Sequence, residues 1–383
     1  MRKLSLSVTI LFALGALVIG AAVGAFGYGM YDSLSYSTDP NPSLTVKDSA
    51  RSSADIVHSD FMVHFLELGN KFAGDCTYIK AGDCDILIDA GSRTSSVSTI
   101  SEYIDQYVTD GKLEYVIVTH AHEDHYAGFS AINGSIFDLY KCGTIIDFAQ
   151  TNQVEEKNGK KTMYGNYLLE RQAAINKGAT HYTAKECREN NNYTFNLGGV
   201  ATMTILDQKF YYQKSSTENN HSVCTLFTYN SHNYLFTGDL EKDGEKDLIA
   251  KNSIPKIDVY KAGHHGSKTS SCPELMQVIQ PKIVCVCCCC GSPEYTKTNA
   301  NQFPTQEFIN NIAPYTDKVY VTTLCIDYDN GTFESMNGNI VISFDSAGIV
   351  VCCGSGDSRV LKEWEWFKNN RTCPASWESD RNT

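Results

Sequence analysis

The sequence is short of positive charge. Its 383 residues include 32 lysines and arginines against 44 aspartates and glutamates, so the formal net charge is −12. A chain with this balance is not expected to bind long nucleic acid through a broad electrostatic surface. The deficit still allows a local phosphate site built from metal ions and one or two lysines.

Two signatures of other site classes are also missing. No G-x-S-x-G motif occurs, so nothing indicates a serine nucleophile. The fifteen cysteines include no C-x-x-C pair with a spaced partner pair, which disfavours a structural zinc site. Five of them, Cys285 and Cys287 to Cys290, follow Ile283 and Val284 and predict a buried strand in which cysteine acts as a small apolar residue. A metal or cluster site in this run is the alternative.

The chain begins with a basic start and a long uncharged stretch. Arg2 and Lys3 precede residues 4–31, which carry no charge and are rich in Leu, Ile, Val, Ala and Gly. Crossing a bilayer takes about 20 apolar residues, so residues 1–31 predict a transmembrane anchor, favoured by length, or a signal peptide cleaved near Val23-Gly24-Ala25. Because basic residues stay in the cytoplasm, the rest of the chain is expected outside it.

Three further regions follow. Residues 32–58 are rich in Ser, Asp and Pro and predict a linker. Residues 59–353 alternate strand-like and helix-like patterns, which predicts one mixed α/β domain. Residues 354–383 form a tail with all three tryptophans, and a short helix docked on the domain is favoured over a binding module.

The densest chemical signal is H-A-H-E-D-H at residues 120–125. It follows an apolar, β-branched run that predicts a buried strand. His120 and His122 are two residues apart, so in an extended segment they point to the same side and can share one ion. Asp124 and His125 lie where a helix begins and can face a second ion. Imidazole with carboxylate suits zinc, or manganese or iron in its place.

Two more predicted strands end in metal-type ligands. One ends in F-T-G-D-L, which contains Asp239, and the next runs into K-A-G-H-H-G, which contains His264 and His265. A carboxylate at Asp239 can bridge two ions, although an aspartate in this setting is also an ordinary helix N-cap. Two cations about 3.5–4 Å apart would hold a hydroxide ready to attack a carbonyl or a phosphorus.

Together these motifs resemble the metallo-β-lactamase superfamily, and within it the soluble domain of the competence protein ComEC. The similarity includes L-I-D-A-G, N-L-G-G-V, L-F-T-G-D-L-E and D-V-Y-K-A-G-H-H-G-S-K-T-S and covers about residues 60–350. It implies an αββα sandwich with one site at the edge where the loops of the two sheets meet. The multi-span channel of the full competence protein is absent from this sequence, so DNA uptake is not carried over.

The resemblance also implies roles for individual residues. The implied metal ligands are His120, His122, Asp124, His125, Asp239 and one histidine of the His264–His265 pair, with His265 favoured. Asp124 and His265 are assigned to catalysis as well.

Other implied roles concern the substrate. ComEC-like domains carry N-N-x-S before the G-D motif, and here the variable position is His221, which is either a ligand or a neighbour of the metals. Asn220 is expected to orient substrate or water. Three residues after the ligand histidine are expected to receive a phosphate or another anion: Ser267, Lys268 and Thr269.

Two departures from the family pattern are expected to affect substrate choice. The first loop, G-N-K-F-A-G-D at residues 69–75, is longer than the usual G-Q-G-D, and Tyr126-Ala127 stands where Ile-Gly is usual. Both are expected at the rim of the pocket.

The sequence therefore predicts an exported hydrolase with two divalent metal ions, zinc or else manganese or iron. A phosphodiester, of nucleic acid or of a phosphate-bearing surface molecule, is the favoured substrate. Hydrolysis of a lactam, lactone or thioester is the second enzymatic hypothesis. A non-catalytic binding protein on the same fold is the third. The expected partners are a small-molecule or phosphodiester substrate and, through residues 1–31, a membrane.

Overall fold

A computed structural model describes residues 43–48 and 56–378, and the features below belong to the unit Leu44–Thr383. The expected anchor or signal peptide, residues 1–31, lies outside the described ranges. Within those ranges, no helix has both the length and the apolar character needed to cross a bilayer.

The first sheet has nine strands in the order β1-β19-β18-β2-β3-β4-β5-β6-β9. In that order they are Ser43–Asp48, Gly348–Cys353, Ile340–Asp345, Phe61–Phe65, Thr77–Ala81, Cys84–Ile88, Lys112–Val118, Lys141–Asp147 and Thr180–Thr183. The sheet is mixed, because β2, β3 and β4 pair antiparallel whereas β4, β5, β6 and β9 run parallel.

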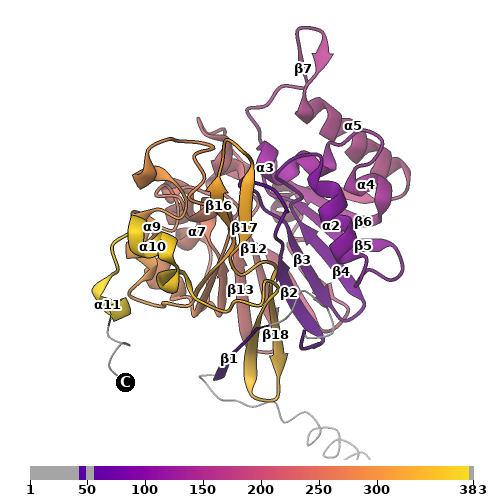
Figure 1. Cartoon of the computed structure of the whole chain (residues 1–383). Coiled ribbons are helices and arrows are strands. Elements are labelled where there is room, and N and C mark those ends of the chain that lie inside the picture. Colours follow the sequence, from indigo (N-terminus) through magenta and orange to yellow (C-terminus); the bar gives the residue numbers. More distant parts are fainter. Residues whose placement is uncertain (1–42, 49–55, 379–383) are drawn as a thin grey trace, which may run out of the picture. The chain divides into compact units, whose positions relative to one another are not determined.

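The second sheet has eight strands in the order β10 to β17. They are Thr194–Leu197, Ala201–Ile205, Thr225–Tyr229, His232–Phe236, Val259–Lys261, Ile283–Cys290, Val319–Asp327 and Thr332–Ser335. Strands β10 to β13 are antiparallel and β13 to β16 are parallel, so this sheet is also mixed. A separate hairpin, β7 (Glu156–Lys157) with β8 (Lys160–Lys161), projects from the domain beyond α5 (Figure 1).

Helices cover the outer face of each sheet, in the order expected for an αββα sandwich (Figure 1). Beside the first sheet lie α2 (Ser96–Ile104), α4 (Ile136–Leu139) and α5 (Met163–Asn176). Beside the second lie α7 (Lys242–Lys251), α8 (Pro273–Ile279), α9 (Gln306–Ile312) and α10 (Glu365–Asn370). The remaining α-helices are α3 (Glu123–Tyr126), α6 (Ala184–Glu189) and α11 (Ala375–Glu378).

The main core lies between the two sheets. On β2, the Phe61 ring is 5.0 Å from that of Tyr234, and the Phe65 ring is 6.0 Å from that of Phe236. These four rings are buried, so each removes a large apolar area from water. Burial on both faces also explains why the parallel strands read as nearly continuous apolar runs.

The cysteine-rich run is a buried strand, as predicted. All eight residues of β15 are buried, and none of the fifteen cysteines forms a disulfide. Only Cys325 and Cys373 are partly exposed. In β15, cysteine therefore fills the place of a small apolar residue between neighbouring strands.

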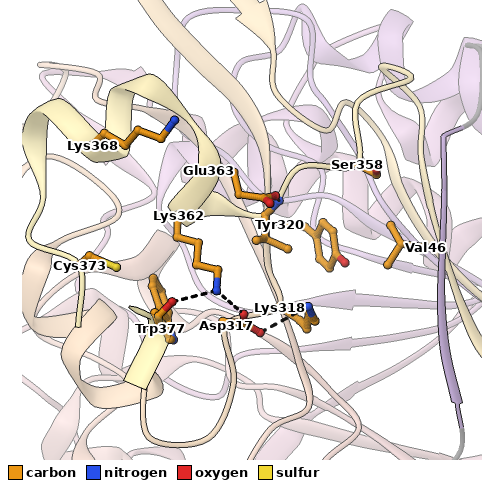
Figure 2. Close-up of a pocket in the computed structure, with 11 residues that line it drawn as sticks. Val46, Asp317, Lys318, Tyr320, Ser358, Lys362, Glu363, Lys368, Cys373 and Trp377 are labelled. Atoms are coloured by element: carbon orange, nitrogen blue, oxygen red, sulfur yellow. Dashed lines mark hydrogen bonds and ion pairs between the residues drawn. The ribbon is translucent and has the colours of Figure 1, made fainter. Parts of the chain in front are cut away.

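Described segments before and after residues 59–353 both pack against the domain. Residues 43–48, assigned above to a linker, form strand β1 beside β19, because Leu44, Thr45 and Val46 give a short β-prone run next to a free sheet edge. The tail docks on the second sheet as expected. Trp377 is buried, and Lys362 Nζ donates to its carbonyl at 3.1 Å and lies 2.6 Å from Asp317 Oδ2, beside a pocket of about 540 Å³ (Figure 2).

Candidate metal centre

The predicted ligands meet at one edge of the sandwich. His120 to His125 follow β5 in the first sheet, whereas Asp239 follows β13 and His265 follows β14 in the second. Parallel strands place their carboxyl ends at the same edge of a sheet, and loops from those ends form the usual ligand sites of α/β folds. Here the loops of the two sheets come into contact, since His265 Nε2 lies 3.2 Å from Asp124 Oδ2.

Four buried side chains form the centre, and we call them the inner group: Asp124, His125, Asp239 and His265. Each can offer one ligand atom within 4.8 Å of the other three. His125 Nε2 is 3.2 Å and His265 Nε2 is 3.5 Å from Asp239 Oδ2. Neither Asp239 oxygen nor His125 Nε2 has a hydrogen-bond partner. Buried polar atoms without partners are costly, so this donor set fits a divalent cation.

Two further histidines lie beside the inner group, and we call them the outer pair: His120 and His122. His120 Nε2 lies 3.1 Å from His122 Nδ1 and 3.9 Å from Asp239 Oδ2. Burial, with the neighbouring His125, lowers the pKa of His120, which keeps its imidazole neutral and able to bind metal. Asp239 thus lies between the other inner-group residues and the outer pair, where its carboxylate could be shared.

Charge is concentrated in the inner group. Burial disfavours the charged form of His265, but Asp239 and Asp75 outweigh it and raise the pKa of His265 to about 10. Burial is likewise outweighed at His125, where Asp239, Asp89 and Asp75 raise the pKa. These carboxylates attract positive charge, which protons supply in the metal-free protein and a bound cation would supply in their place.

Contacts behind the inner group fix its two imidazoles. His125 Nδ1 donates to Asp89 Oδ2 at 2.7 Å, and Thr119 holds Asp89 through its backbone N–H and its hydroxyl at 2.8 and 2.7 Å. His265 Nδ1 donates to the Cys287 carbonyl at 2.8 Å. With Nδ1 engaged, each ring directs Nε2 into the centre, which is the usual way that proteins orient metal-binding histidines.

The backbone around the site is shaped for close approach. A Cβ on Gly91 would lie 1.7 Å from the Asp124 carbonyl oxygen, so the L-I-D-A-G segment requires glycine there. His264 and His265 both adopt positive φ, 47° and 53°, which is costly for residues with side chains. The turn gives the two histidines different surroundings. His265 is fully buried in the inner group, whereas His264 is partly exposed, with Nε2 3.8 Å from Asp239 Oδ2.

The structure places His221 and Asn220 outside the inner group and the outer pair. His221 Nε2 accepts a hydrogen bond from the Ser215 N–H at 3.1 Å, and its Nδ1 lies 3.6 Å from Glu218 Oε1. Asn220 donates to Ser215 Oγ at 3.0 Å and accepts from the Glu241 N–H at 3.1 Å. Both side chains therefore hold the loop before β12 together.

The three residues expected to receive an anion lie just beyond the histidine turn. Thr269 Oγ1 is 2.8 Å from His264 Nδ1 and 3.1 Å from Ser267 Oγ. Lys268 is exposed, and its Nζ donates to Asn301 Oδ1 at 2.8 Å. Thr269 therefore contacts His264 and Lys268 contacts Asn301, and both of these partners line the cleft described next.

A cleft of about 480 Å³ opens onto the centre. Its lining residues come from several loops: Arg93, His122, Glu123, Asp124, His264, Glu294, Tyr295, Asn301 and Phe303. The expected rim residue Tyr126 is not among them, because it is buried with its ring against Tyr167 at 5.7 Å. The long first loop does reach the rim, since the Ala73 N–H donates to Glu294 at 2.8 Å.

Four residues near the centre were not assigned from the sequence. Asp75 and Lys261 form a buried ion pair, and Lys261 Nζ also lies 3.9 Å from Asp239 Oδ1. Asp89 supports His125, as described above. Tyr295 donates its hydroxyl to Asp124 Oδ2 at 2.6 Å. Asp75 ends the first loop, G-N-K-F-A-G-D, Asp89 lies in L-I-D-A-G, and Lys261 begins K-A-G-H-H. These motifs could therefore have indicated the three residues from the sequence. No such motif contains Tyr295.

Comparison with known proteins agrees with this architecture. Residues 69–136 match the Metallo-beta-lactamase superfamily. ComE operon protein 3 of Bacillus subtilis is 30% identical over 129 residues, which is 34% of this chain and 15% of that protein. Recombination protein 2 of Haemophilus influenzae is 36% identical over 69 residues, 18% of this chain and 8% of that protein. The chain thus spans only a small part of the length of either relative.

A solved structure, the metallo-beta-lactamase fold protein YhfI from Bacillus subtilis, aligns with 72% of this chain and 99% of its own, at a TM-score of 0.39 and 13% identity. The resemblance seen in the motifs is confirmed: residues 69–136 match the metallo-β-lactamase superfamily, and the curated relatives are distant ComEC-like proteins that the chain covers only in part. The chain has an α/β metallo-β-lactamase-like fold with two mixed sheets and a buried cluster of histidines and aspartates suited to metal.

Proposed function

We propose that this metallo-β-lactamase superfamily protein is a hydrolase with two divalent metal ions that cleaves phosphodiesters. The observation that carries the proposal is the inner group, whose buried Asp239 oxygens have no hydrogen-bond partner and lie between two sets of histidines. Zinc suits this donor set, and manganese or iron are the alternatives. The motive for a phosphate-bearing substrate is the ComEC-like H-H-G-S-K-T segment at residues 264–269.

The chain's own residues have separable tasks in this proposal. Ions in such a site lower the pKa of a bound water and neutralise charge that develops on the attacked group. Asp239 holds the inner group and the outer pair in one arrangement. Asp89 and the Cys287 carbonyl keep the Nε2 atoms of His125 and His265 directed inward. Asp124 lines the cleft from which a reacting group would enter, and the buried His265 lies behind it, with Nε2 3.2 Å from Asp124 Oδ2.

The charge of the cleft favours a local phosphodiester over a long polyanion. Its single arginine, Arg93, has its Nη2 2.7 Å from Glu294 Oε1 and its Nε 3.6 Å from Glu123 Oε1. With the arginine engaged by carboxylates, the metals themselves would have to attract the substrate phosphate. We therefore expect a small phosphodiester or the end of a phosphate-bearing surface molecule to be the better substrate.

The test is metal content by elemental analysis on the full chain, together with turnover of bis-p-nitrophenyl phosphate. Two equivalents of metal with turnover, both lost in Asp239→Ala, support the proposal. Asp243→Ala is the matched control, because this nearby carboxylate is exposed and pairs only at the surface with Lys209 at 2.9 Å. Metal binding without phosphodiester turnover would redirect the proposal to lactones and thioesters. A chain that binds no metal would make the non-catalytic scaffold the leading hypothesis.

We also propose that the domain acts outside the cytoplasm, held or exported by residues 1–31. The support is the uncharged, apolar stretch that follows Arg2 and Lys3. Protease added to intact cells should then degrade the domain, and removal of residues 4–31 should protect it. Protection of the full chain would contradict export.

A further inference from the structure

Tyr295 lies beside the inner group but belongs to none of the motifs that carry the family resemblance. It is in the segment that follows β15, and 55% of its surface is exposed to solvent at the cleft. Its hydroxyl nevertheless points inward and donates to Asp124 Oδ2 at 2.6 Å. The ring therefore faces an incoming substrate while the hydroxyl faces the metal centre.

The segment that carries Tyr295 is held in place by its neighbour, Glu294. One Glu294 oxygen lies 2.7 Å from Arg93 Nη2, and the other accepts the Ala73 N–H at 2.8 Å. The Arg93 guanidinium is also fixed from the other side, 3.8 Å from the centre of the Phe72 ring. These contacts present Tyr295 at a defined position, and they occupy the arginine that would otherwise bind an anion.

Other side chains at the cleft already have hydrogen-bond partners. Lys268 Nζ donates to Asn301 Oδ1 at 2.8 Å, and His264 Nδ1 lies 2.8 Å from Thr269 Oγ1. Among the described residues that line the cleft, Tyr295 carries the hydroxyl that reaches the inner group. Its ring centre lies 5.9 Å from that of Phe303, so the two aromatic side chains form one wall of the cleft.

We propose that Tyr295 is a substrate-binding residue whose hydroxyl donates to an anionic oxygen of a phosphate ester beside Asp124. In the resting protein the same hydroxyl donates to Asp124 Oδ2, so binding exchanges one acceptor for another. The ring, with Phe303, contacts the organic group of the ester. This inference rests on the proposed phosphodiesterase function and names the residue that positions its substrate.

The experiment uses the full, metal-loaded chain and inorganic phosphate as the probe, with binding measured by titration calorimetry. We expect Tyr295→Phe to weaken phosphate binding by less than the roughly tenfold effect of one whole hydrogen bond to a charged oxygen, because the wild-type hydroxyl gives up its bond to Asp124 when it binds phosphate. Metal content should stay at the wild-type value. Tyr295→Ala should in addition raise the KM for bis-p-nitrophenyl phosphate above that of Tyr295→Phe, because it removes the ring. Tyr328→Phe is the matched control. The Tyr328 ring centre lies 6.2 Å from that of Phe72, but Tyr328 does not line the cleft.

Either of two results would overturn the inference. Phosphate affinity equal to that of the wild type in Tyr295→Phe would show that the hydroxyl does not touch the anion. Loss of metal in step with the loss of phosphate affinity would show that Tyr295 only supports Asp124. Failure of the proposed function is distinguishable, because the wild type itself would then neither bind phosphate nor turn over the ester.

Discussion

The inner group and the outer pair each contain two histidines, but the fold holds these imidazoles differently. The inner group is buried, and both of its imidazoles have Nδ1 fixed by an oxygen: Asp89, directly after β4, for His125, and the Cys287 carbonyl, within β15, for His265. In the outer pair, His122 is partly exposed and lines the cleft, and its Nδ1 contacts His120 instead of a supporting oxygen.

If the chain binds two metal ions, as proposed, this difference predicts that their two positions are not equivalent. A preformed, buried set of ligands needs little movement of its side chains to bind an ion, although the ion must displace the protons that Asp239 and Asp75 favour on His125 and His265. Supporting contacts of this kind are worth about 10–100-fold in metal affinity. In the outer pair the two facing nitrogens lie 3.1 Å apart, a spacing that two ligands of one ion can have, but His122 is partly exposed to water. We therefore expect one tightly held ion in the inner group and a more readily exchanged ion at the outer pair.

The largest expected effect is the difference in metal content and turnover between His265→Ala and His264→Ala. His265→Ala should lose the tightly held ion and reduce turnover by more than the roughly 100-fold seen when only a supporting contact is removed. His264→Ala should keep both ions, because its side chain lies outside the inner group. Elemental analysis after dialysis, with turnover of bis-p-nitrophenyl phosphate, measures both. Loss of metal from His264→Ala alone would reverse the assignment.

The second prediction concerns the outer pair. His122→Ala should retain one ion after dialysis but fail to take up a second when metal is added, and its turnover should fall accordingly. His221→Ala is the matched control, because its Nε2 is engaged by the Ser215 N–H and the variant should bind metal as the wild type does. If calorimetry instead shows two equal binding events in the wild type, the two positions are equivalent and the comparison fails.

The third prediction concerns Asp89, which supports His125 from behind and is not itself a member of the inner group. Asp89→Asn leaves His125 in place but weakens the hydrogen bond that orients it, so metal affinity should fall about 10–100-fold. Asp147→Asn is the matched control. Asp147 is equally buried at the end of β6, but its partners are Arg171, His181 at 2.9 Å and Tyr167 at 2.7 Å. It should lower stability and leave metal affinity unchanged.

These contrasts also show where sequence reasoning stops. Local spacing was enough to predict the strand before His120, the shared side of His120 and His122, and Asp239 at a strand end. The choice between His264 and His265 depends on two positive φ angles, which no spacing encodes. The contact between Tyr295 and Asp124 joins residues 171 positions apart and depends on how the segment after β15 folds over the cleft. Contacts that only tertiary packing creates could therefore not be predicted from the sequence.

The smallest expected effect extends the comparison to His64, a buried histidine in β2 that lies outside the metal centre. Its Nδ1 is 2.8 Å from the Tyr103 hydroxyl. Burial, with a smaller contribution from His58, lowers the pKa of His64 from 6.5 to about 3.

Because the unfolded chain binds a proton near pH 6.5 and the folded chain does not, this group removes stability as pH falls below 6.5. Between pH 7 and pH 5 the loss is about 2 kcal/mol of unfolding free energy, at about 1.4 kcal/mol per pH unit below 6.5. His64→Asn keeps a polar group near Tyr103 but cannot titrate. Its unfolding free energy, measured by urea titration at both pH values on metal-free protein, should therefore fall less than that of the wild type. Equal losses of unfolding free energy in the two proteins would mean that His64 is protonated in the folded chain. His64 would then resemble His125 and His265, although it lacks the carboxylates that raise their pKa.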